Sequence, residues 1–180
     1  MVFNSLTFAL FFTCVLVLYY VVLKKWRAKK TMLLVASYLF YAAWNPPFVI
    51  LIWVSTLVDW HVAKAIAASD SKSRKRIYVI LSLATNLGLL GYFKYGEFVL
   101  DNFAYLVNSL GIAYTPATWE IVLPVGISFY TFQTLSYTLD VYRGEEPWDS
   151  PLDFALFVTF FPQLVAGPIV RAYNFLPQCT

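Results

Sequence analysis

Histidine and cysteine, which supply many metal and nucleophilic sites, are almost missing from this chain. Its 180 residues include one histidine, His61, and two cysteines, Cys14 and Cys179. Two cysteines give no disulfide framework, and neither has metal-ligand neighbours in sequence. A phosphate-binding glycine loop, a serine nucleophile elbow and zinc-ligand spacing are also lacking. We therefore expect no metal site and no tightly bound cofactor.

Charge is scarce as well. Only 13% of the residues are charged, whereas 60% are hydrophobic and 19% aromatic, and the mean hydropathy is +0.65. Soluble domains carry about 25% charged residues. A soluble chain of this composition would have too few polar residues to cover several apolar helices. The composition predicts an all-α, multi-pass integral membrane helical bundle with a lipid membrane around it.

The basic residues gather in two short clusters. Of 13 Lys and Arg, five lie within residues 24–30 and four within residues 72–76. Between apolar runs, such clusters indicate cytoplasmic loops rather than a nucleic-acid surface. This placement puts the N-terminus outside. No basic region precedes the first apolar run, so we do not expect a cleavable signal peptide.

Apolar runs bounded by charges, proline or glycine define the expected elements. The run 31–44 is short for a crossing, so residues 31–68 either span twice or form a shallow hairpin turning at Asn45-Pro46-Pro47. Glu97 and Asp101 bring charge into the run 95–110, which predicts an amphipathic helix there. With no repeat or internal break, we interpret 1–180 as a single membrane domain. The expected elements are spans over 5–23, 31–44, 48–68, 77–93 and 121–140, an amphipathic helix over 95–110, and a broken or re-entrant segment over 154–170.

Polar side chains recur inside the apolar run that follows residue 121. Tyr130, Gln133, Tyr137 and Asp140 are spaced by three or four residues, which places them on one side of a helix. A polar stripe of this kind faces protein or water. The run therefore does more than anchor the chain in lipid.

The last apolar run is interrupted by Pro162, Gly167 and Pro168. Backbone groups freed by such breaks cannot face lipid, so this segment should be buried in protein or line a wet cavity. Arg171 follows and marks either a membrane boundary or a polar pocket.

Five polar residues of this last third are our candidates for lining a substrate tunnel. A structural role stays open, because Asp140 could instead pair with Arg143 or Arg171 in an ion pair. We interpret His61 as a boundary histidine, and Asp59 as a partner of Lys64 or a helix cap. The tunnel candidates are Tyr130, Gln133, Asp140, Gln163 and Arg171.

Four stretches carry a resemblance to a known family. LPVGISFYTFQTLSYTLDVYRGE and DFALFVTFFPQLVAGPIVRAYNFLPQ are similar to consecutive signatures of the membrane-bound O-acyltransferase (MBOAT) family, in its bacterial alginate O-acetylation branch. MVFNSLTF and NLGLLGYFKY resemble the same branch. The matches follow in order along the whole chain, as expected of the N-terminal part of an MBOAT fold.

The resemblance implies a multi-pass enzyme of the bacterial inner membrane. Such an enzyme moves an acyl group, acetyl in this branch, from a cytoplasmic thioester such as acetyl-CoA toward a hydroxyl of an exported polysaccharide such as alginate. An extracytoplasmic acyltransferase partner often completes the transfer. The family's catalytic histidine lies in its C-terminal half, so we place no catalytic residue in this chain. We expect the 180 residues to be an N-terminal fragment or truncated product that is inactive alone.

A second hypothesis belongs to another class of protein. The broken segment would equally suit a non-enzymatic membrane scaffold or a transporter-like subunit that uses it as a substrate path. Composition and periodicity do not distinguish the two hypotheses.

Overall fold

Helices make up all the regular structure in the computed structural model, which describes residues 5–115, 122–167 and 170–179. Within these ranges no strand is present. The prediction of an all-α chain is therefore confirmed.

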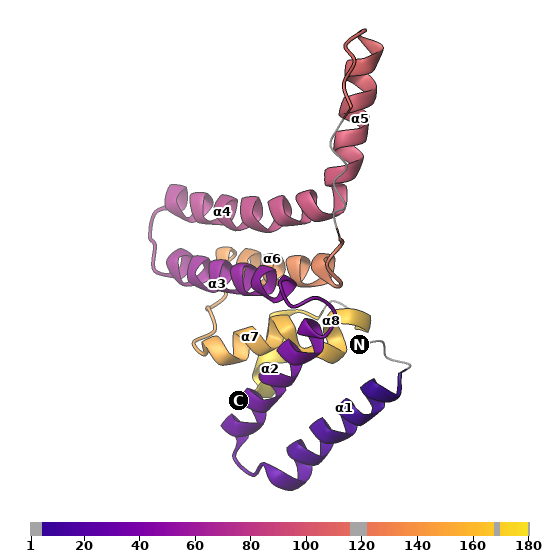
Figure 1. The fold of residues 1–180 in the computed structure, drawn as a ribbon. Helices are drawn as coiled ribbons and strands as arrows, with labels where there is room; N and C mark the ends of the chain where they lie inside the picture. Colours follow the sequence, from indigo (N-terminus) through magenta and orange to yellow (C-terminus); the bar gives the residue numbers. More distant parts are fainter. Residues whose placement is uncertain (1–4, 116–121, 168–169, 180) are drawn as a thin grey trace.

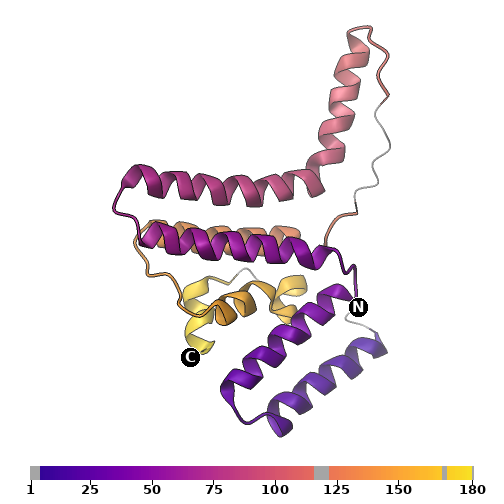
Figure 2. The same ribbon diagram turned by 60° about the vertical axis from the view of Figure 1, so that its left-hand side comes forward.

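The first two helices form a hairpin (Figure 2). Helix α1 (Leu6–Val17) continues through a π-helical turn over Leu18–Val22, and α2 (Trp26–Ala42) follows a short connection. The hydroxyl oxygen of Ser5 accepts a hydrogen bond from the Phe8 amide at 3.1 Å and so caps α1. Helix α2 begins before the apolar run, because Lys and Arg are good helix formers. Most of the first basic cluster is consequently helical rather than part of a loop.

Three helices form the central layer of the molecule (Figure 1). They are α3 (Phe48–Ala67), α4 (Lys72–Leu90) and α6 (Ile127–Tyr142), and each packs against the other two. Pro46 and Pro47 precede α3, where proline's missing N–H costs the helix nothing. The main hydrophobic core lies among these helices and the C-terminal elements.

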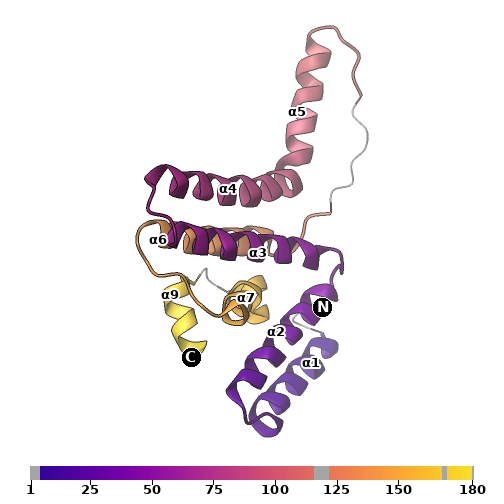
Figure 3. The same ribbon diagram turned by 90° about the vertical axis from the view of Figure 1, so that its left-hand side faces the viewer.

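The chain turns away from this layer after α4. A π-helical turn over Gly91–Tyr95 leads into α5 (Gly96–Ser109), which projects from the rest of the molecule (Figures 1 and 3). Ala104 is the one residue of α5 that is buried, and apolar side chains such as Phe98 and Phe103 are exposed. A helix is thus present where the amphipathic segment was expected.

The C-terminal part is a series of short helices. Helix α7 (Pro151–Thr159) and α8 (Phe161–Ala166) are separated at Phe160, and α9 (Ala172–Phe175) leads into a 3₁₀ turn over Leu176–Cys179. The break between α7 and α8 has a direct cause in Pro162. In a continuous helix its ring would clash with the Val158 carbonyl, and it has no N–H to donate there.

At this break one freed backbone group is bonded within the protein, which is one of the two outcomes expected for the broken segment; Pro168 lies outside the described residues. The Phe161 amide donates to the hydroxyl oxygen of Ser37 on α2 at 3.2 Å. The Phe161 ring packs with Phe11 and Phe40, at centroid distances of 5.4 Å to each. Helix α2 therefore covers the break between α7 and α8.

The start of α6 depends on a glycine. Gly126 has φ +76°, a conformation that disfavours other residues, and a Cβ there would lie 2.7 Å from the backbone oxygen of Leu164. Gly126 thus allows α8 to pack directly on the α6 N-terminus. The helix begins later than the expected span over 121–140, and residue 121 lies outside the described part of the chain.

Two helical segments are long and apolar enough to cross a membrane by length and composition. They are Phe48–Ala67, with 20 residues, and the run Lys72–Ser109, with 38 residues. Leu6–Val22 and Pro151–Leu164 are apolar but shorter. The membrane character expected from composition is supported by these two segments.

Candidate functional site

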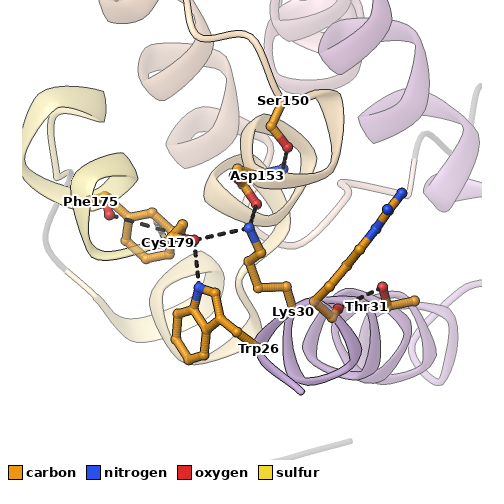
Figure 4. A network of polar contacts seen from close by, with 8 residues as sticks. Trp26, Lys30, Thr31, Ser150, Asp153, Phe175 and Cys179 are labelled. Carbon is orange, nitrogen blue, oxygen red and sulfur yellow. Dashed lines mark hydrogen bonds and ion pairs between the residues drawn. The ribbon is translucent and has the colours of Figure 1, made fainter.

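A buried ion pair joins the first basic cluster to the C-terminal elements (Figure 4). The Lys30 ammonium lies 2.7 Å from a carboxylate oxygen of Asp153, and their side chains are only 13% and 4% exposed. Lys30 also donates to the Cys179 carbonyl at 2.9 Å, and the Trp26 indole N–H donates to the same carbonyl at 2.7 Å. Residues about 150 positions apart in sequence meet here. Lys30 is therefore a structural cation and not part of a solvated basic loop.

The Cys179 side chain is unsuited to nucleophilic chemistry. Burial, followed by the nearby Asp153 carboxylate, raises the pKa of the thiol, and Lys30 opposes this only in part. Because the thiolate is the nucleophile, a raised pKa leaves little of the reactive form near neutral pH. Cys14, which its apolar run predicts to be a small packing residue, is in contrast exposed on α1.

A polar network lies buried between α3, α4 and α6. The Asp59 carboxylate is fully buried and accepts hydrogen bonds from the Ser82 hydroxyl and, at 2.7 Å, from the Asn86 amide. The Asn86 side-chain oxygen in turn accepts from Ser55 at 2.5 Å and from Thr134 at 3.3 Å. One carboxylate and one amide thus tie three helices together.

This geometry corrects our interpretation of Asp59. It lies inside α3, so it does not cap the helix, and Lys64 pairs with Asp149 at 2.5 Å instead. Within the described residues no basic side chain forms an ion pair with Asp59. A buried carboxylate is costly unless it is hydrogen-bonded, and Ser82 and Asn86 supply the bonds.

The polar stripe of α6 faces protein. Tyr130, Gln133 and Tyr137 are buried, whereas Phe132 on the opposite side is exposed. The Tyr137 hydroxyl oxygen accepts from the Trp148 amide at 2.9 Å. The Tyr130 hydroxyl and the Gln133 amide nitrogen have no hydrogen-bond partner among the described residues. Such atoms need a partner such as water, a substrate group or another part of the protein.

The other tunnel candidates do not converge with these. Asp140 lies 3.7 Å from Arg143, so the structural pairing that we left open is present. Arg171 is exposed at the start of α9, and Gln163 lies half-buried on α8. None of the five candidates lines the groove between α1 and α2, the cavity between α3 and α7, or the cavity formed by residues 145–153 with Tyr173.

His61 lies on the outer side of α3. Its ring nitrogen Nδ1 is 2.7 Å from the Leu57 carbonyl of the preceding turn, and the side chain is exposed. It also borders a cavity of about 380 Å³ between α3 and α7. These contacts agree with a surface histidine and bring it no nucleophile or carboxylate partner within the described residues.

Curated proteins similar to this chain share one activity in their names. The chain is 41% identical over 99% of its length to probable alginate O-acetylase AlgI of Pseudomonas aeruginosa, and 39% identical over the same share to that of Pseudomonas putida. It is 35% identical, over 83% of its length, to the peptidoglycan O-acetyltransferase of Helicobacter pylori. The chain belongs to the membrane-bound O-acyltransferase family. The resemblance seen in its motifs is thus supported along its whole length.

The match covers only part of each of these relatives. The chain spans about a third of the length of the curated relatives, 34%, 37% and 32% respectively. A scan of family models finds no match. Among solved structures, none matches the chain.

Sequence reasoning missed the two buried polar networks of this membrane-bound O-acyltransferase chain. By sequence, Lys30 belongs with its charged neighbours, and Asp59 has Lys64, five residues away, as a partner or else a helix-cap role. One signal was available for the second network: Ser55 and Asp59 on α3, and Ser82 and Asn86 on α4, are each four residues apart. This spacing places each pair on one face of its helix.

Proposed function

We propose that the protein containing this chain is an O-acetyltransferase of the bacterial inner membrane. It would move an acetyl group from a cytoplasmic thioester such as acetyl-CoA toward a hydroxyl of an exported polysaccharide such as alginate. The identity of 41% over 99% of the chain to a probable alginate O-acetylase supports this proposal most strongly. The relative named for peptidoglycan supports a polysaccharide acceptor in general.

The proposed reaction is a transesterification. The acceptor hydroxyl oxygen attacks the thioester carbonyl, the carbon–sulfur bond breaks, and the thiol leaves with the proton given up by the hydroxyl. A general base speeds such a step. We assign that base to a part of the enzyme outside this chain, because the one histidine of the chain, His61, is exposed on an outer helix face, and the resemblance implies a catalytic histidine in the C-terminal half of the family.

We propose a multi-pass topology with the N-terminus outside and both basic clusters in the cytoplasm. The two apolar segments, Phe48–Ala67 and Lys72–Ser109, support membrane insertion. The positive-inside rule supports the orientation. In this topology the thioester reaches the enzyme from the cytoplasm, where both basic clusters lie. An extracytoplasmic acyltransferase partner would take the acetyl group on the other side of the membrane.

Within this enzyme, the chain would act as the helical scaffold of the substrate tunnel, without activity by itself. The unpartnered Tyr130 hydroxyl and Gln133 amide, both on the buried side of α6, support a place for these residues near the tunnel. Asp140, Gln163 and Arg171 remain candidates for lining the tunnel.

A chimera tests this proposal. The chain would replace its matching third of the Pseudomonas aeruginosa relative, in cells that lack that relative, and the acetyl content of the exported polysaccharide would be measured. We expect acetylation by the chimera and none by the 180-residue chain alone. Acetylation by the chain alone would contradict the scaffold role.

The same chimera tests the tunnel. Gln133→Ala should lower acetylation about tenfold or more, as for loss of a positioning contact, while the amount of membrane-inserted protein stays unchanged. Phe132→Ala, on the exposed side of the same helix, is the matched control. A folded chimera without any acetylation would favour the non-enzymatic scaffold or transporter-like alternative.

A further inference from the structure

A groove lies between α1 and α2. Its volume is about 830 Å³, within the range of ligand pockets. The walls of the groove are largely apolar and include Val15, Leu18, Val35 and Leu39. At one end of the groove lie Lys25 and Arg27. We call it the α1–α2 groove. Apolar surface with a cationic end matches an amphiphile with an anionic head.

The length of the groove fits one leaflet of a bilayer. Arg27 and Leu39 are both on α2, and at about 1.5 Å per residue they lie about 18 Å apart along the helix. Half of a hydrocarbon core of about 30 Å is close to this length. The basic end also coincides with the first basic cluster, which our proposed topology places at the cytoplasmic surface.

The two cations at this end are available for a ligand. Lys29 lies over the Tyr19 ring at 4.5 Å, and Lys30 is held by Asp153. Within the described part of the chain, no acidic side chain forms an ion pair with Lys25 or Arg27. A guanidinium and an ammonium that line the same groove suit a phosphate group, because both donate charge-assisted hydrogen bonds.

We propose that the α1–α2 groove binds an anionic phospholipid of the cytoplasmic leaflet. Its acyl chains lie along the apolar walls, and its phosphate contacts Lys25 and Arg27. Basic pockets between helices on the cytoplasmic side are a known form of lipid recognition. The inference rests on the membrane placement proposed above and is independent of acetyl transfer.

The experiment uses the 180-residue chain in nanodiscs of phosphatidylcholine, alone or mixed with phosphatidylglycerol. Phosphatidylglycerol that remains bound after extraction into detergent is measured by mass spectrometry. In Lys25→Ala/Arg27→Ala we expect retention to fall about 30-fold, from the loss of two basic contacts. Lys72→Ala/Arg74→Ala removes the same two residue types from an exposed helix end and should retain the lipid.

Cys14 gives an independent readout, because its exposed side chain lines the groove. In a Cys179→Ser background, phosphatidylglycerol should slow alkylation of Cys14, and the Lys25→Ala/Arg27→Ala variant should lose this protection. Equal lipid loss in both double variants would overturn the proposal, since it would show that any basic surface of the chain attracts the anionic lipid. Cys14 protection that is independent of lipid would also overturn it and assign the groove to a protein segment.

Discussion

At the residue scale, the Lys30–Asp153 pair is expected to contribute strongly to stability. Lys30→Met would leave the Asp153 carboxylate buried and without its cation, at a cost of about 3–5 kcal/mol in unfolding free energy. Lys30→Met with Asp153→Leu should recover most of this loss, because no charge then remains buried. Unfolding midpoints of the purified chain in detergent measure both effects.

The exposed pair Lys64–Asp149 is the control for this prediction. It has a short distance of 2.5 Å, yet its side chains are 34% and 98% exposed. Lys64→Met should therefore cost about 0–1 kcal/mol. Equal losses for Lys30→Met and Lys64→Met would contradict the structural role of the buried pair.

At the element scale, the packing of α8 on α6 depends on Gly126. Gly126→Ala would add a backbone strain of about 1–2 kcal/mol for positive φ, and a Cβ at 2.7 Å from the Leu164 oxygen, so α8 would be displaced. We expect a lower unfolding midpoint and greater proteolysis around α8.

Gly111 provides the matched control. Its φ is +83°, but a Cβ there meets nothing within 4 Å. Gly111→Ala should therefore show the backbone strain alone. If the two variants lost the same stability, the close approach of α8 to Gly126 would have no energetic importance.

At the scale of the whole molecule, the proposed topology predicts the sidedness of two turns. In a chain without Cys14 and Cys179, Ala43→Cys lies between α2 and α3, and Ser71→Cys between α3 and α4; both positions are exposed. An impermeant maleimide should label residue 43 in intact spheroplasts and residue 71 only after lysis. The reverse pattern would place the N-terminus inside.

How much of the structure the sequence predicts depends on how far apart along the chain the interacting residues lie. Helix existence followed from apolar runs, and the break near Pro162 followed from a local loss of a hydrogen-bond donor. Helix starts were placed less well, because charged residues at the starts of α2 and α4 extend the helices beyond their apolar parts. The burial of Tyr130, Gln133 and Tyr137 followed from their shared helix side.

The sequence by itself thus determined the all-α class, the apolar character and, through its motifs, the family. These properties depend on composition and on residues close together along the chain. Only the tertiary structure decided that Lys30 meets Asp153, that Asp59 is held by Ser82 and Asn86, and that α1 and α2 enclose a groove. Such contacts join residues on different helices, and periodicity gives the side of a helix on which a residue lies but not the neighbour that it meets there.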